Sequence, residues 1–468
     1  MSKRNFILLI IVLIILILGV FGFLYFNRSS SSGTSYSAPG TNFFAQFNPF
    51  GSKTTTPPVT NPTTPVTPPV TTPVANVKLK KVSSMPIAGF TVFSKERLLP
   101  LPILPTPTTA PVVDGGTTTS STQTTPGTTT TPSTTTTKAA NTKTTKPTAP
   151  LTEFATVLRY VARATGNIYE TFADTIAEGQ FTTTIIPKVY DAYFGNGGNS
   201  VVMRYLQPDG QTIETFIGNL PKEYLGADTI STNTITGSLL PNNVKSISLS
   251  PDNSSIFYLF NSGTDMIGTT LNFLTNRKVQ IFDSPFTDWT SWWPNSQTIT
   301  LTTKPAGSVQ GYMYAMSQSG TNFNQVLSNI NGLTTMTSPD GKLILYGDNN
   351  LDLSIYNINT NSSTLVGVKT LPEKCVWGSG SDVVYCAVPR SIVSTAQYPD
   401  AWYQGEVSFS DQIWKIDIKT GNTTMLVDPL TVPGGEDIDG IKLQLDSAGN
   451  YLFFVNKKDS FLWEFNLN

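Results

Sequence analysis

A turn that recurs every 43 to 45 residues is the feature that most limits the fold of this 468-residue chain. Its clearest copies are SLSPDNSSIFYLF, SWWPNSQTITLTT and MTSPDGKLILYGD, in which the prolines are Pro251, Pro294 and Pro339. Looser copies lie near Gly195, Gly378 and Ser447. Each copy reads as a strand, a turn and a strongly apolar strand, and a second, more polar hairpin follows it. Four strands in about 44 residues is the size of one β-propeller blade, so the sequence predicts an all-β propeller.

These units resemble the WD40-like, TolB-type propeller family, in which an SPDG turn precedes a β-run, as in MTSPDGKLILYGD. The resemblance covers most of residues 151–468. The chain also resembles membrane-anchored propeller proteins of bacteria. The resemblance implies a fold and no particular activity, because propellers support many functions.

The number of blades depends on an isolated stretch, VKLKKVSSMPIAGFTVFS, at residues 77–94. The C-terminus supplies three strands of a blade and stops before the fourth, while residues 156–175 read as middle strands without an inner strand. The stretch has the shape of a junction between two blades: an outer strand, a kink with proline, and an inner strand. If Ser94 marks the inner turn, it lies 101 residues before the next inner turn at Gly195. Treating about 56 of these residues (97–152) as an insertion leaves 45, which is one period.

We therefore predict seven blades over residues 76–468, closed by residues 77–84, with 97–150 as a Thr-rich disordered insertion in the first blade. A six-bladed ring is the alternative, in which the stretch belongs to a linker. Whether the Thr-rich tract is glycosylated stays open.

The N-terminus predicts a membrane anchor. Residues 5–26 carry no charge and are long enough to cross a bilayer as a helix. Lys3 and Arg4 precede this run, so the positive-inside rule places the N-terminus in the cytoplasm and the propeller outside. A cleaved signal peptide is the alternative, but its apolar region would be shorter and followed by small residues. We expect a stub and transmembrane signal anchor over 1–27 and a disordered Ser/Thr/Pro-rich linker over 28–75.

Composition excludes several function classes. The chain has no histidine, which removes Ser-His-Asp triads, Cys-His nucleophiles and HExxH zinc sites. Its net charge is −1, so nothing indicates a nucleic-acid partner. We expect no metal and no cofactor. Chemistry that uses carboxylates alone stays possible.

The candidate binding residues lie in a long loop, 389–410, at a position where other blades turn tightly. Aromatic loops on rigid scaffolds are frequent binding sites, although the same aromatics can instead pin the loop to the propeller. The tentative binding residues are Tyr398, Asp400, Trp402, Tyr403, Gln404 and Glu406.

Two further features are expected to be structural. Cys375 and Cys386 flank a predicted hairpin turn, so they either form a disulfide or remain two buried thiols. The stretch GGEDIDG (434–440) carries carboxylates, but its spacing fails the EF-hand pattern and favours a solvated acidic turn.

The sequence thus favours a membrane-tethered propeller outside the cytoplasmic membrane that binds or scaffolds a protein or a cell-envelope polymer. The alternative is a glycan-processing enzyme, a hydrolase or lyase, that uses carboxylates near the propeller axis. That alternative predicts Asp or Glu side chains with raised pKa values at the axis.

Overall fold

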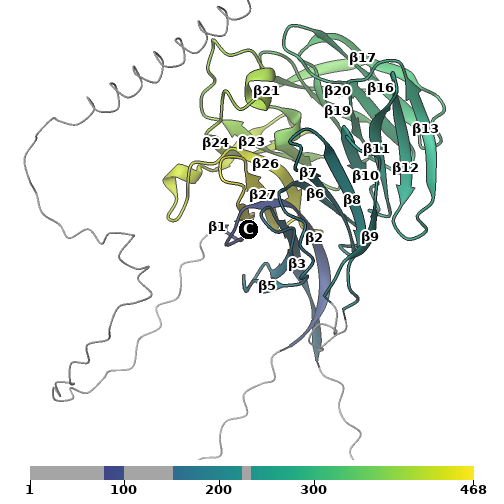
Figure 1. The fold of residues 1–468 in the computed structure, drawn as a ribbon. Coiled ribbons are helices and arrows are strands. Elements are labelled where there is room, and N and C mark those ends of the chain that lie inside the picture. Colours follow the sequence, from purple (N-terminus) through teal and green to yellow (C-terminus); the bar gives the residue numbers. More distant parts are fainter. Residues whose placement is uncertain (1–77, 100–150, 224–232) are drawn as a thin grey trace, which may run out of the picture. The chain divides into compact units, whose positions relative to one another are not determined.

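The computed structural model describes residues 78–99, 151–223 and 233–468, which belong to one unit, Val74–Asn468. In this part of the chain, antiparallel strands form seven four-stranded sheets arranged as the blades of a propeller (Figure 1). The prediction of an all-β, seven-bladed propeller is confirmed, and the six-bladed alternative is wrong.

The first three blades follow one another along the chain, each running from its inner to its outer strand. Blade 1 contains β2 (Ile87–Leu98), β3 (Thr152–Ala162), β4 (Ile168–Phe172) and β5 (Gly179–Gln180); blade 2 contains β6 (Val189–Gly195), β7 (Ser200–Leu206), β8 (Ile213–Asn219) and β9 (Thr236–Leu239); blade 3 contains β10 (Ser246–Leu249), β11 (Ser255–Ser262), β12 (Asp265–Asn272) and β13 (Lys278–Ser284).

The next three blades repeat this order. Blade 4 contains β14 (Trp289–Trp292), β15 (Thr298–Thr303), β16 (Gln310–Ser317) and β17 (Asn324–Asn331); blade 5 contains β18 (Thr334–Thr337), β19 (Leu343–Gly347), β20 (Asp352–Asn357) and β21 (Ser362–Lys369); blade 6 contains η2 (Pro372–Lys374), β22 (Cys375–Trp377), β23 (Val383–Pro389), α2 (Asp400–Tyr403), β24 (Asp411–Asp417) and β25 (Thr423–Val427).

Blade 7 joins the two ends of the propeller. After η3 (Pro429–Thr431) it takes β26 (Gly440–Leu445), β27 (Tyr451–Asn456) and β28 (Leu462–Asn466) from the C-terminus. Its outer strand is β1 (Leu79–Lys81), which pairs antiparallel with β28 before the chain continues into β2 of blade 1. The predicted closure by residues 77–84 is therefore confirmed, and we call the β1–β28 pairing the seam.

The first blade differs from the expectation in one detail. Ser94 is not at a turn, because β2 continues to Leu98 and stays paired with β3 as far as Leu98↔Thr152. This hairpin is the longest in the described residues, and Figure 1 shows it extending beyond the other blades. Residues 100–150, which hold most of the predicted insertion, lie outside the described residues.

The recurring turn has a local chemical cause. In blade 5, the Ser338 hydroxyl donates to the Asp340 carboxylate (2.6 Å) and accepts from the Leu343 N–H (3.0 Å). Gly341 takes the positive φ of 73° that closes the turn. Ser250 and Asp252 make the same hydroxyl–carboxylate bond in blade 3. The pattern found in the sequence is thus a side-chain-capped turn between the inner strand and its neighbour.

The strand order defines two faces of the disc. The turns between first and second strands and between third and fourth strands lie on one side, which we call the turn face. The loops between second and third strands and the links between blades lie on the other side, which we call the loop face. Since β1 is an outer strand, the chain enters the propeller from the turn face at Lys78, whose carbonyl accepts from Asn466 near the C-terminus.

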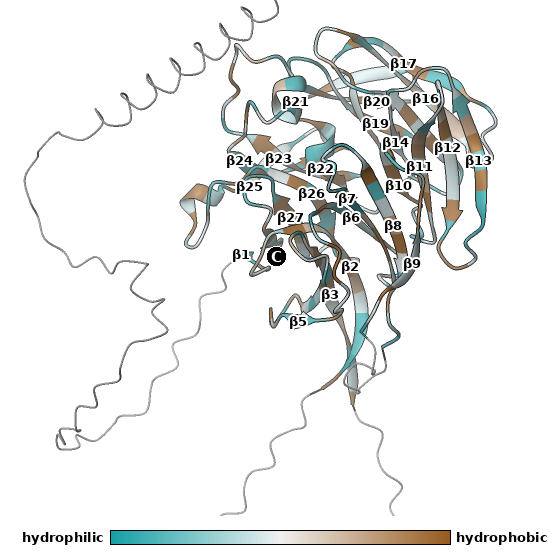
Figure 2. Ribbon diagram, in the orientation of Figure 1, coloured by the Kyte–Doolittle hydropathy of each residue, from teal (hydrophilic) through white to brown (hydrophobic). Residues whose placement is uncertain are grey.

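The core lies between the blades. Among the described residues, seven hydrophobic clusters each combine side chains of two neighbouring blades, and an eighth lies beneath loop 389–410. Apolar segments accordingly follow the strands (Figure 2). Trp289 and Trp293 fill the space between blades 3 and 4, and Trp463 is fully buried beside the seam.

In the described residues no helix has the length and apolar character needed to cross a membrane. The predicted anchor, 5–26, and the predicted linker, 28–75, lie outside the described residues.

The seam should carry measurable stability. Leu79 and Val82 are 1% and 3% exposed, and burial of each such side chain contributes about 1.5–3 kcal/mol. A chain that starts at residue 83 should therefore lose about 3–6 kcal/mol of unfolding free energy compared with one that starts at residue 76, as measured by urea unfolding. Equal stability of the two chains would contradict the closure.

The seam also predicts a pH dependence. Glu464 on β28 is 1% exposed, and burial raises its pKa from 4.5 to about 7 although Lys80 lies 3.0 Å away. Because the folded state holds this proton more tightly than the unfolded state, unfolding free energy should fall by roughly 3 kcal/mol between pH 4.5 and 7. Glu464→Gln should not show this decrease in unfolding free energy, whereas the exposed control Glu406→Gln should show it. Identical pH profiles for wild type and Glu464→Gln would rule the effect out.

Candidate binding site on the loop face

Loop 389–410 connects β23 to β24 and lies on the loop face, where it is packed by its own aromatic side chains. Tyr398, Trp402 and Phe409 are buried together, and they pack on Leu351 and Leu371 from blade 5 and its link to blade 6. The Trp402 and Phe409 rings are stacked with centroids 6.2 Å apart. The loop is therefore held by a small hydrophobic core of its own.

Polar contacts fix this core to blade 7. The Trp402 indole N–H donates to both carboxylate oxygens of Asp439, at 3.2 and 2.9 Å. The Phe409 N–H donates to the same carboxylate at 3.0 Å. The Lys457 ammonium donates to the Trp402 carbonyl. Asp439 is thus the main anchor of the loop.

A buried charged cluster lies behind this anchor. Lys374 has no exposed side-chain surface, and its ammonium lies 2.7 Å from Asp411 and 2.5 Å from Asp439. For Asp439 burial opposes ionisation, but Lys374 and the donated hydrogen bonds hold its pKa below the usual value. Burial dominates for Asp411 and raises its pKa to about 6. Asp439 lies in the GGEDIDG stretch, so the expectation of a solvated acidic turn is wrong for this residue.

The loop also reaches across to blade 4. Asp400 accepts a hydrogen bond of 2.6 Å from the Gly307 N–H, and Asn349 of blade 5 donates to the Gly307 carbonyl. Contacts to blades 4, 5 and 7 hold this loop across part of the loop face, and we call residues 389–410 the brace.

The six predicted binding residues therefore separate into two groups. Tyr398 and Trp402 are 3% and 4% exposed and hold the loop in place, which is the structural alternative considered for them. Tyr403, Gln404 and Glu406 are exposed, and the Tyr403 hydroxyl donates to Glu373 at 2.5 Å. Asp400 is partly exposed and serves as an acceptor for the backbone of blade 4.

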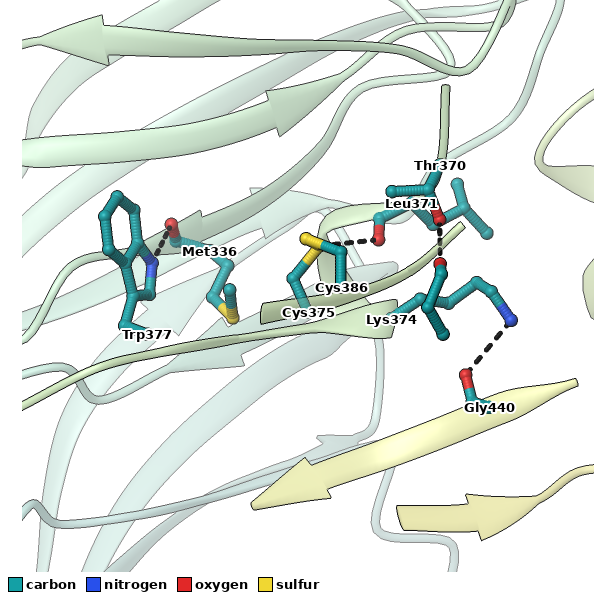
Figure 3. The surroundings of a disulfide bond; sticks show 9 residues. Met336, Thr370, Leu371, Lys374, Cys375, Trp377, Cys386 and Gly440 are labelled. Atoms are coloured by element: carbon teal, nitrogen blue, oxygen red, sulfur yellow. Dashed lines mark hydrogen bonds between the residues drawn. A yellow bond between two sulfur atoms is a disulfide. The ribbon is translucent and has the colours of Figure 1, made fainter. Parts of the chain in front are cut away.

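The two cysteines lie in blade 6 beneath the brace. Cys375 and Cys386 are direct partners across β22 and β23, and a disulfide joins their sulfurs. Figure 3 shows the bond beside Lys374, whose ammonium donates to the Gly440 carbonyl at 3.0 Å. No cysteine of the chain is free. The disulfide thus ties the inner strand of blade 6 to its neighbour, next to the buried charges.

A second polar cluster lies on the inner strands of three adjacent blades. Inner strands β2, β6 and β26 each have a shift of register, at Ile87/Gly89, Val189/Asp191 and Ile441/Gln444. The inner strands of the other four blades pair regularly. Bulges change the direction of side chains and are frequent beside functional sites. Lys442 lies in such a bulge with a positive φ of 54°, which is uncommon for a residue other than glycine.

The bulges bring together charged side chains of blades 7 and 2 and a backbone carbonyl of blade 1. The Lys442 ammonium donates to the Ala88 carbonyl (2.8 Å) and to Asp191 (2.5 Å). Arg204 on β7 lies 3.1 Å from the other oxygen of Asp191. The Lys442 side chain is 31% exposed and the two others about a tenth. We call Lys442, Asp191 and Arg204 the axial cluster.

The axial cluster has an excess of positive charge. Burial of Asp191 opposes its ionisation, but Lys442 and Arg204 outweigh that effect and hold its pKa below the usual value. One carboxylate therefore faces two cations, which leaves one positive charge in excess. Burial and the Asp191 charge raise the pKa of Tyr193, whose ring lies beside Lys442. The glycan-enzyme alternative predicted a raised carboxylate pKa at the axis, whereas the axial carboxylate has a lowered one.

Sequence reasoning missed the axial cluster, because its three residues are 13 to 251 positions apart. One signal was available: charged residues form only 13% of the chain, and Asp191 and Lys442 each interrupt an inner strand of otherwise uncharged residues. Among the described residues, no group of three or more Asp, Glu or Cys side chains is arranged to hold a metal ion.

No protein-family model matches the chain, and no curated protein matches it. Solved structures similar to it include oligogalacturonate lyase from Vibrio parahaemolyticus, with 10% identity and a TM-score of 0.45, covering 67% of this chain and 86% of that one. Another is oligogalacturonate lyase in complex with manganese, with 10% identity and a TM-score of 0.46, covering 67% and 85%. At this identity no activity can be transferred, and the relation to TolB-type propellers stays a prediction.

The brace makes a clear prediction for two neighbouring aromatics. Trp402→Ala should cost about 3–5 kcal/mol of unfolding free energy, because it opens a cavity and leaves Asp439 without its indole donor. Tyr403→Ala, one position away on the exposed side, should cost only about 1 kcal/mol, because it removes the hydrogen bond to Glu373 and opens no buried cavity. Urea unfolding of both variants measures the difference. Equal losses would show that the loop is not held by Trp402.

Proposed function

We propose that this protein is a membrane-tethered binding module whose propeller lies outside the cytoplasmic membrane and presents its loop face to a protein or a cell-envelope polymer. The observation that carries this proposal is the placement of the chain's entry and the axial cluster. The chain enters at Lys78 on the turn face. The axial cluster lies near the loop-face ends of the inner strands, on the side of the propeller opposite Lys78.

Two further observations support the location. The uncharged run 5–26, preceded by Lys3 and Arg4, has the length and flanks of an anchor with an external C-terminal domain. The disulfide between Cys375 and Cys386 fits an oxidising compartment, where such bonds persist.

The proposal is tested by matched charge reversals on the two faces. Lys188 and Lys245 are exposed on the loop face, immediately before β6 and β10. Lys342 and Lys419 are exposed in turns on the turn face. Intact cells that carry each Lys→Glu pair in the full-length protein are treated with a membrane-impermeant crosslinker, and the protein is then affinity-purified.

The loop-face pair should lower partner recovery at least fivefold, while the turn-face pair should keep it. If the wild-type protein captures nothing, the proposed binding function fails. If both pairs lose the partner equally, the assignment of the loop face fails.

A second candidate function is processing of a glycan at the axis, as a hydrolase or a lyase. The two cations beside Asp191, Lys442 and Arg204, favour this candidate although the pKa of Asp191 is lowered, because fixed positive charges can stabilise negative charge that develops during bond cleavage. Its test is the release of new reducing or unsaturated ends from acidic glycans by wild type, and its loss in Asp191→Asn.

A further inference from the structure

We infer that the axial cluster and the adjoining rim of the loop face bind the carboxylates of an acidic polysaccharide. This inference rests on the proposed binding function and names its ligand class.

The charge balance favours an anionic ligand. Asp191 is shared by Lys442 and Arg204, and one ammonium hydrogen of Lys442 has no partner beyond Ala88 and Asp191 in the described residues. The Lys442 side chain is the most exposed of the three. An incoming carboxylate can therefore pair with Lys442 without displacing Asp191, and such a charge-assisted bond is stronger than a neutral one.

The rim adds positive charge next to the cluster. Lys188 and Lys245 immediately precede the inner strands of blades 2 and 3, and both are exposed. In the same blades, Asp209 lies on the loop between the second and third strands and Asp265 begins the third strand, so both lie farther from the axis. The positive part of the rim ends at blade 4, where exposed Asp288 precedes the inner strand. Two cations beside the cluster suit a polymer with repeated charges better than a ligand with a single charge.

The backbone geometry indicates that Lys442 is placed for a purpose other than packing. Its positive φ and the bulge around it cost conformational energy, and the bulge in β2 leaves Ala88 out of the strand register, so that its carbonyl accepts from the Lys442 ammonium. Three bulges in adjacent blades, and regular pairing in the other four, concentrate this irregularity at the cluster.

The neighbouring inner strands favour a sugar over an acidic peptide. Ser246 of β10 and Ser291 of β14 are partly exposed and their hydroxyls lie 3.0 Å apart, while buried Ser248 contacts Ser291 at 3.1 Å from behind. The Tyr193 ring, partly buried against the core between blades 2 and 3, lies beside Lys442. Hydroxyls, an aromatic face and cations together match the hydroxyls, apolar ring face and carboxylate of a uronic acid residue.

The test measures binding to the purified full-length chain by isothermal titration calorimetry. The probes are hexasaccharides of galacturonic acid and of mannuronic acid, their methyl esters, and a hexaglutamate peptide. At least one uronate should bind with an affinity that falls as salt rises, and its methyl ester should bind at least tenfold more weakly.

Variants locate the site. Lys442→Gln should weaken binding at least tenfold, and Lys442→Arg, which keeps the charge, should stay within about threefold of wild type. Lys278→Gln, on the outer strand of blade 3, is the matched control and should change nothing. If thermal unfolding shows that Lys442→Gln is misfolded, Lys188→Gln on the exposed rim replaces it and should weaken binding at least threefold.

Three results overturn the inference: neither uronate binds, the esters bind as well as the acids, or the Lys442 and Lys188 variants bind like wild type. Binding of hexaglutamate alone would also overturn it and assign an acidic peptide instead. If crosslinked partners are still captured in cells while no uronate binds, the ligand class fails and the proposed function stands.

Discussion

Pairing of β1 with β28 is the interaction on which the rest of the structure depends. A propeller has no core at its axis, and each blade is stabilised mainly by its two neighbours. One open gap would expose the apolar faces of two blades together with an unpaired strand edge. The seam prevents this by adding Leu79 to the core between blades 6 and 7 and by covering the edge of β28.

The seam also explains how the chain is laid out around the ring. The segment that closes blade 7 continues directly into β2, so whatever precedes residue 78 is attached at the turn face. The loop face is left for the brace and the axial cluster. Lys78 and the axial cluster thus lie on opposite faces of the propeller, which is the arrangement that the proposed role in presentation requires.

The loop face has two different halves. The brace covers the half formed by blades 4 to 7, where charges such as Lys374 and Asp411 are buried and paired. On blades 7, 1 and 2 the charges of the axial cluster remain partly open to solvent. A buried pair contributes to specificity of packing, whereas a partly exposed excess of positive charge is available to a ligand. Tyr398 and Trp402, two of the three aromatic residues that suggested a binding loop, therefore build its scaffold.

The sequence by itself determined the propeller, its seven blades and the closing strand, because each depends on local chemistry that repeats: a Ser-Pro-Asp turn, an apolar strand and a fixed period. It identified loop 389–410 as exceptional but could not decide which of its aromatics are buried. The sequence does not distinguish Trp402 from Tyr403, since both are aromatic residues of the same loop. Only the structure shows that Trp402 is buried against Leu351 and Asp439 whereas Tyr403 is exposed. The axial cluster was decided by tertiary structure, since the bulged strands β26 and β6 bring Lys442 to Asp191 and Arg204 joins them from β7. The sequence shows only that Asp191 and Lys442 are single charges in otherwise uncharged strands.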